Sequence, residues 1–278
     1  MTRQTFEIAL IFAPLMMAID VLIKNHTISL VAIGFSFALL ADAEQLPVPA
    51  PGTLRAQESA ALWPAVARAK VIYVGETHDK AMDHAYELRL VRGMIRRRIA
   101  FAIGWEMFDY TQQALLDAWD RGAISLQQLF RRTGFDRGWA IYSPIYARIL
   151  ETARRSARNN VALNAPQTLV RKVAHGQKLS RQERALLPRD FKTNQAAYQH
   201  FVSLMGEHPG LTAEHLRSFF AAQNVWDQTM ADRILRFERL RGETKLLVLA
   251  GRGHVAGGFG IPYYVGQKKP LQQLILLP

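Results

Sequence analysis

The chain has 278 residues, of which 49% are hydrophobic and 21% charged, so it is long enough for one large or two small folded domains. It contains no cysteine, which excludes disulfides, thiolate metal sites, a catalytic cysteine and a lipidated N-terminal cysteine. The formal net charge of +12 favours an anionic partner. The basic residues, however, form helix-like runs that predict solvated helix faces, and no zinc-finger spacing or RNA-binding aromatic motif indicates nucleic acid.

The first 43 residues differ in composition from the rest of the chain. The apolar run from Ile28 to Leu40 has the length of a signal-peptide core, and Ala41-Asp42-Ala43 matches an A-x-A cleavage site. A Pro-rich linker, residues 44–54, follows. We therefore expect residues 1–43 to be an export signal that delivers the folded part, residues 55–278, to the periplasm. The alternative is an uncleaved inner-membrane anchor, and in both cases membrane association occurs only through this segment.

Beyond the linker, short apolar segments alternate with amphipathic ones. Near-continuous apolar strands that are separated by helices indicate a mostly parallel sheet with helices on both faces, which is an α/β fold. We predict strands over residues 70–74, 99–105, 160–164, 245–250 and 272–277, and helices over residues 58–69, 81–98, 112–119, 125–131, 144–158 and 167–175.

The alternation of strands and helices stops between residues 179 and 241. The pattern there is helical, with long pieces at 193–207 and 212–241 and a break at His208-Pro209-Gly210. We predict an all-α insertion subdomain at about 179–241, which would act as a lid over the edge of the sheet. Its histidines could face a planar cofactor, or they could belong to ordinary amphipathic packing, and the same two interpretations apply to residues 226–230.

Two of the predicted strands end in the same short motif, Gly-x-x-His. The motifs are Gly75-Glu76-Thr77-His78 and Gly251-Arg252-Gly253-His254. The ends of parallel strands meet along one edge of a sheet, where open α/β proteins bind their ligands. We therefore expect both motifs to lie side by side, together with Glu106, which follows a third predicted strand.

These strand ends carry the residue types of a metal site. Carboxylate and neutral imidazole are both good ligands for a divalent first-row ion such as Mn, Co or Zn. In a metal-dependent hydrolase, Glu76 or Glu106 would activate a water molecule and Arg252 would stabilise the developing oxyanion. Asp79 is expected to cap the next helix, and His84 is a further candidate ligand on that helix. The predicted metal ligands are Glu76, His78, Glu106 and His254.

Taken together, the motifs resemble those of the ChaN-like family of haem-binding uptake proteins. This family is grouped with the Tiki metalloproteases and the erythromycin esterase-like proteins, which share paired Gly-x-x-His motifs. The resemblance covers roughly residues 55–265. It rests on Val74-Gly75-Glu76-Thr77-His78-Asp79, Glu106-Met107-Phe108-Asp109, Asn164-Ala165-Pro166, Trp226-Asp227-Gln228-Thr229-Met230-Ala231 and Ala250-Gly251-Arg252-Gly253-His254.

The resemblance implies a protein that binds haem or a small anionic ligand in haem or iron uptake. It also implies a tyrosine as the axial haem ligand and two haems stacked between paired subunits, hence a homodimer. The motifs do not fix which tyrosine ligates the iron, so Tyr142, Tyr146 and Tyr198 are all candidates, with Arg252 as a further haem-binding residue. We predict a periplasmic haem-binding protein, with the metal-dependent hydrolase as the alternative.

Overall fold

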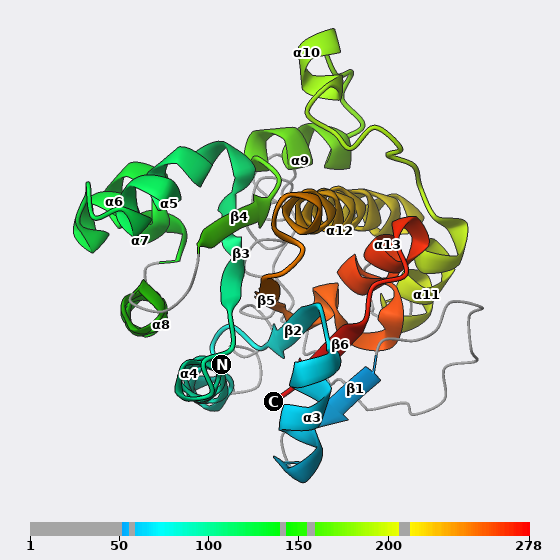
Figure 1. The fold of residues 1–278 in the computed structure, drawn as a ribbon. Helices are drawn as coiled ribbons and strands as arrows, with labels where there is room; N and C mark the ends of the chain where they lie inside the picture. The colour runs from blue at the N-terminus through cyan, green and yellow to red at the C-terminus, as the bar shows by residue number, and fades with distance from the viewer. Residues whose placement is uncertain (1–51, 56–58, 140–142, 155–158, 206–211) are drawn as a thin grey trace, which may run out of the picture. The chain divides into compact units, whose positions relative to one another are not determined.

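The computed structural model describes residues 52–55, 59–139, 143–154, 159–205 and 212–278 (Figure 1). The predicted signal or anchor segment, most of the linker, and Tyr142 lie outside the described residues. Within the described part, no helix is both long enough and apolar enough to cross a bilayer. The described residues form two compact units. One comprises residues 167–225, and the other comprises residues 52–166 and 226–278.

The larger unit is built on a six-stranded sheet in which every pairing is parallel. Every residue of β2 is buried, as are most of β3 and β5, because their continuous apolar runs place hydrophobic side chains on both faces. The predicted α/β class with a mostly parallel sheet is therefore confirmed. The strands are β1 (Gly52–Arg55), β2 (Val71–Glu76), β3 (Phe101–Asp109), β4 (Asn160–Asn164), β5 (Lys245–Gly251) and β6 (Gln273–Leu277), in the order β1-β6-β2-β5-β3-β4.

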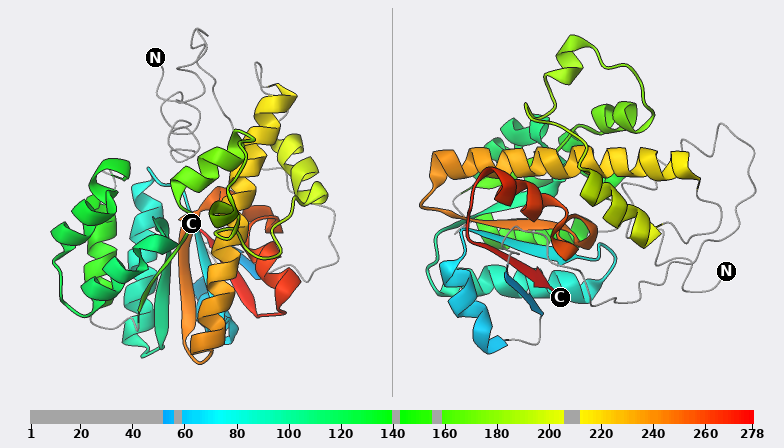
Figure 2. Two further views of the ribbon diagram at one scale, coloured as in Figure 1. Left: turned by 90° about the horizontal axis from the view of Figure 1, so that it is seen from above. Right: turned by 90° about the vertical axis from the view of Figure 1, so that its right-hand side faces the viewer.

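Helices cover both faces of this sheet. Helices α4 and α8 lie on one face, whereas α13 and the C-terminal half of α12 lie on the other (Figures 1 and 2). The helices of this unit are α3 (Ser59–Arg68), α4 (Ala81–Arg96), α5 (Gln113–Asp120), α6 (Leu126–Thr133), α7 (Phe135–Gly138), α8 (Ser143–Arg154) and α13 (Ile261–Lys268), together with the part of α12 (Ala213–Arg241) that follows Val225.

The start of α4 differs from the sequence expectation. Asp79 was predicted to cap this helix, but its N-cap residue is Lys80, which makes no side-chain capping bond. Instead, Asp83 in the first turn accepts a hydrogen bond of 2.8 Å from the backbone N–H of Thr77. A carboxylate at the N-terminus of a helix is stabilised by the free N–H groups and the dipole there. In α4 this carboxylate is that of Asp83 and not that of Asp79.

The smaller unit is helical. It contains α9 (Gln167–Ala174), α10 (Arg181–Arg184), α11 (Gln195–Met205) and α12 as far as Val225. All described elements between residues 179 and 241 are helices, as predicted. The compact unit nevertheless begins earlier, at Gln167, and it ends inside α12, because the second half of that long helix packs in the larger unit.

Three local predictions need correction. Strand β3 was expected to end at Trp105, but it continues to Asp109 with a shift of its register against β4, so Glu106 lies inside the strand. Residues 52–54 of the predicted linker belong to β1, which pairs with β6 at the edge of the sheet. Helix α13 was not predicted; it has Pro262 in its first turn, where proline is well tolerated.

The packing of α4 on α3 depends on Gly93. A Cβ atom at this position would overlap the indole of Trp63, which is also held by the guanidinium of Arg97 at 3.7 Å from the ring centroid.

Gly93→Ala should therefore lower the free energy of unfolding by about 1–3 kcal/mol, although Ala normally stabilises a helix interior by about 1 kcal/mol over Gly. Urea unfolding measures this. The control, Gly138→Ala, adds a Cβ into open space, and equal effects of both changes would contradict the prediction.

Candidate functional site

The strand ends that were predicted to meet do lie at the same edge of the sheet. In the parallel register, Glu76 of β2 is opposite Gly251 of β5, and Trp105 of β3 is opposite Leu249 of β5. Strand β5 lies between β2 and β3. The two Gly-x-x-His turns and Glu106 are therefore brought together by neighbouring strands, as expected for the carboxyl edge of a parallel sheet.

Glu106 lies between the two motif histidines. Its Oε1 atom is 3.3 Å from Nε2 of His254 and 3.9 Å from Nε2 of His78. Its Oε2 atom accepts a hydrogen bond of 2.6 Å from the backbone N–H of Gly251. The Oε1 atom is buried and makes no well-formed hydrogen bond. Glu106 Oε1 is thus the shared neighbour of the two imidazoles, and we call His78, Glu106 and His254 the outer set.

Each imidazole of the outer set is oriented by a second carboxylate. His78 Nδ1 is 2.7 Å from Glu76 Oε1, and His254 Nδ1 is 2.6 Å from Asp227 Oδ1. A carboxylate that holds the Nδ1 proton leaves the Nε2 lone pair available to a metal ion, which is the common arrangement around metal-ligating histidines. Asp227 was not singled out from the sequence, because residues 226–230 fitted both a helix that faces a cofactor and ordinary helix packing.

In the outer set, burial and charge pairing shift the pKa values of the side chains in opposite directions. Burial lowers the pKa of His254, but Glu106 and Asp227 raise it, to about 10. Burial also lowers the pKa of His78, which Glu76 and Glu106 nevertheless raise above its ordinary value. Burial raises the pKa of Glu106, but His254 and His78 lower it by more, so the pKa lies below its ordinary value. In ion-free protein the set is therefore held by ion pairs, and a divalent cation would replace the imidazole protons.

A second cluster adjoins the outer set through Glu76. Tyr146 donates a hydrogen bond to Oε1 of Glu76. The other oxygen of this carboxylate is 3.5 Å from His84 Nδ1, which is also 3.0 Å from Oε2 of Glu87. All four side chains are at most 2% exposed. We call Glu76, His84 and Glu87 the inner set. The sequence analysis named His84 only as a further candidate ligand, and it did not identify Glu87.

The two carboxyl groups of the inner set have opposite pKa shifts. Burial and the neighbouring Glu76 raise the pKa of Glu87 well above its ordinary value. Burial also raises the pKa of Glu76, but its interactions with the neighbouring Glu87 and His78 outweigh this and lower it to about 2. Glu87 is therefore the carboxyl group that carries the proton when no cation is present.

Each predicted haem-binding residue that the structure describes has its own local environment. Tyr146 belongs to the buried cluster, and its side chain has no exposed surface. Tyr198 lies in the helical unit, where its ring contacts Phe220 with a centroid distance of 5.2 Å. Arg252 donates a hydrogen bond of 2.7 Å to the backbone oxygen of Pro278. Tyr142 lies outside the described residues.

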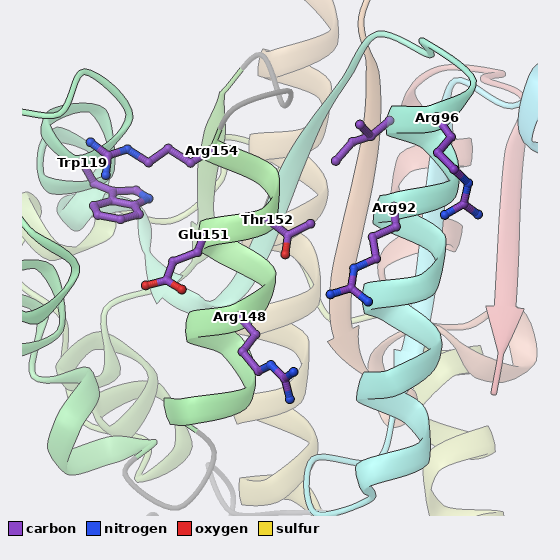
Figure 3. A pocket seen from close by; sticks show the side chains of 8 residues that line it. Arg92, Arg96, Trp119, Arg148, Glu151, Thr152 and Arg154 are labelled. Atoms are coloured by element: carbon purple, nitrogen blue, oxygen red, sulfur yellow. The ribbon is translucent and has the colours of Figure 1, made fainter.

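A basic groove of about 710 Å³ separates α4 from α8 (Figure 3). Within the described structure, Arg92, Arg96 and Arg148 form no ion pair, and the guanidinium of Arg154 stacks over Trp119 at 4.1 Å from the ring centroid. The groove can attract carboxylate or phosphate groups, but neither tyrosine nor histidine lines it. Its lining residues are Arg92, Ile95, Arg96, Trp119, Arg148, Glu151, Thr152 and Arg154.

Comparison with known proteins connects this fold to one family. The family described as "Haem-binding uptake, Tiki superfamily, ChaN" matches residues 62–265, a span that includes both Gly-x-x-His motifs. No protein of curated function matches the sequence.

Two solved structures are similar in fold. ChaN of Campylobacter jejuni with cofacially bound haem has a TM-score of 0.61 and 20% sequence identity, over 79% of this chain and 84% of that one. An erythromycin esterase variant in its open conformation has a TM-score of 0.49 and 15% identity, over 80% of this chain and 72% of that one. The similarity to the Campylobacter protein shows a shared fold.

The pairing of Asp227 with His254 gives a test of the outer set. In metal-free protein, Asp227→Asn should cost about 3 kcal/mol of unfolding free energy at pH 6.5, because it leaves a buried imidazolium without one of its carboxylates. The pKa of His254 is raised on folding, so its contribution is complete below about pH 6.5 and is lost towards pH 10. Urea unfolding at pH 6.5 and pH 10 should therefore show a smaller cost at the higher pH.

The control for this prediction is Glu238→Gln on the same helix. This change removes a surface pair with Lys269, whose side chain is 46% exposed, and should cost less than about 1 kcal/mol. An Asp227→Asn cost as small as that of the control would contradict the ion-paired outer set.

Proposed function

We propose that this chain, which belongs to the ChaN family of haem-binding uptake proteins in the Tiki superfamily, binds haem and takes part in haem or iron uptake. The observation that carries the proposal is the family match, which extends over residues 62–265. The similar structure from Campylobacter jejuni contains cofacially bound haem. If this chain binds haem in the same way, two subunits pair around the stacked haems.

The buried cluster itself does not fit a haem. Haem iron takes one or two axial ligands, and the porphyrin needs an opening as large as its ring. The outer and inner sets instead offer several nitrogen and oxygen ligands that are at most 7% exposed. Tyr146 already donates its hydroxyl hydrogen to Glu76. These residues suit a small ion, so we place the haem elsewhere.

Tyr198 is the candidate axial ligand that we favour. Its ring is half-buried, and its hydroxyl makes no hydrogen bond with any part of the chain that the structure describes. Such a tyrosine can offer its oxygen to iron without breaking an existing contact. The basic groove between α4 and α8 belongs to the larger unit and could hold carboxylate groups, whereas Arg252 is engaged with the backbone of Pro278.

A metal-dependent hydrolase is the second candidate function. The observation that favours it is the position of Glu106 Oε1 beside Nε2 of both His78 and His254, with both imidazoles oriented by carboxylates. A divalent ion such as Mn, Co or Zn held there would supply Lewis acidity and lower the pKa of a bound water. Glu106 would then be a ligand of the ion, and Glu76, which is bonded to Tyr146 and His78, would orient His78.

Export to the periplasm is part of the proposal. It rests on the apolar run at residues 28–40 and the A-x-A sequence that follows it. The alternative remains an uncleaved anchor in the inner membrane. The N-terminal sequence of the protein recovered from a periplasmic extract distinguishes them, since cleavage would leave Glu44 as the first residue.

Haem binding is tested by titrating haemin into the full chain and following the Soret band. We expect a saturable shift at about one haem per chain, which Tyr198→Phe abolishes because the axial oxygen is removed. Tyr263→Phe is the matched control, since this half-buried tyrosine lies in the larger unit against Tyr264. No Soret shift in the unmodified chain would refute haem binding, and an unchanged shift in Tyr198→Phe would refute the ligand assignment.

The hydrolase alternative predicts a bound ion that depends on Glu106. Purified protein incubated with Zn²⁺ and then dialysed should retain it at the outer set. Glu106→Gln should weaken retention at the outer set by about 100-fold, because one anionic ligand is lost while the side-chain shape is kept, so the retained Zn²⁺ should fall by one equivalent per chain. Elemental analysis measures this, with Glu151→Gln as a surface control. Equal retention in both variants would exclude the outer set as the metal site.

A further inference from the structure

We propose that Glu76, His84 and Glu87, the inner set, form a second cation site that binds a divalent first-row metal ion. This site is distinct from the outer set, with which it shares no proposed ligand. It does not depend on haem binding. The observations that carry the proposal are the spacing of the ligand atoms, the tautomer of His84 and two buried carboxylate oxygens without partners.

The ligand atoms of the inner set have the spacing that an ion requires. One atom from each residue can be chosen so that all three lie within 4.8 Å of one another. His84 Nδ1 is 3.0 Å from Oε2 of Glu87 and 3.5 Å from Oε2 of Glu76. Ligands at about 2.0–2.2 Å from a tetrahedral ion are about 3.3–3.6 Å apart. An ion can therefore bind here with little movement of the side chains.

The hydrogen bonding of His84 directs a lone pair towards the two carboxylates. Its Nε2 atom is 2.8 Å from the backbone oxygen of His78, and a carbonyl oxygen can only accept, so Nε2 carries the proton. In the neutral imidazole, Nδ1 then has a lone pair, and it faces the oxygens of Glu76 and Glu87. Three groups of acceptors facing one another require a cation or additional protons between them.

Two oxygens of the inner set have no hydrogen-bond partner. They are Oε2 of Glu76 and Oε1 of Glu87, both on side chains that are fully enclosed by protein. Unpaired carboxylate oxygens are costly in a protein interior. One divalent ion would neutralise both carboxylates, and such N- and O-ligands suit Zn²⁺, Co²⁺ or Mn²⁺. A proton shared by the carboxyl groups is the competing occupant.

The inner site would position the outer set through Glu76. The same carboxylate that would bind the inner ion through Oε2 holds His78 Nδ1 at 2.7 Å through Oε1. Tyr146 fixes this oxygen with its hydroxyl and packs its ring against His84 at a centroid distance of 5.1 Å. Because all its ligands are buried, the inner ion would be structural, and it would orient His78 towards Glu106.

The test separates the two sites by removing a ligand of the outer set first. In chelator-treated full-length His254→Gln, we expect one equivalent of Co²⁺ to bind with a visible ligand-field spectrum. Adding Glu87→Gln or His84→Gln to this background should weaken Co²⁺ binding by about 100-fold or more. The matched control is Glu243→Gln in the same background, which changes an exposed glutamate that follows α12 and should leave Co²⁺ affinity unchanged.

Either of two results would overturn the inner site. One is that His254→Gln binds no Co²⁺, so that a shared proton occupies the inner set. The other is that Glu87→Gln in that background binds Co²⁺ as tightly as its parent. If the double variants do not fold, the NMR signals of the imidazole nitrogens of His84 in the unmodified chain test the inner site. Saturation with Zn²⁺ should shift its Nδ1 signal, and no shift would refute the site. Haemin titration of the same samples reports separately on haem binding.

Discussion

The burial of four carboxyl groups at one edge of the sheet is the constraint on which this site depends. Glu76, Glu87, Glu106 and Asp227 are each at most 4% exposed. A buried carboxylate is strongly destabilising unless it is paired, protonated or bound to a cation. Three histidines and one tyrosine supply the pairing, and the parallel register of β2, β5 and β3 places them within reach. The remaining unpaired oxygens face the positions where we propose metal ions.

Family membership and site chemistry point to different ligands. The family is one of haem-binding uptake proteins, whereas the buried cluster offers nitrogen and oxygen ligands suited to small ions. The two are compatible if haem contacts a tyrosine outside the cluster and the cluster serves as a structural or catalytic centre. The uncompensated arginines between α4 and α8 show that part of the strong basic charge is concentrated on one groove and not only spread over helix faces.

The sequence was sufficient to predict the sheet, most of its strands and the meeting of His78, Glu106 and His254. Continuous apolar runs ending in Gly-x-x-His fix both the strands and the edge at which they end. It was not sufficient for Glu87 and Asp227, because a single acid within an amphipathic helix looks the same whether it faces solvent or the core. The end of β3 and the short strand β1 were also missed, since both depend on pairing with strands that are distant in sequence.

The central claim is that the strand-end cluster is built to hold divalent cations. Anomalous diffraction at the cobalt absorption edge, from crystals of the full chain grown with Co²⁺, tests this most directly. Our account predicts one peak within coordination distance of His78 Nε2, His254 Nε2 and Glu106 Oε1, and a second peak between Glu76, His84 and Glu87. Ordered side chains at this edge of the sheet without an anomalous peak at either position would contradict it.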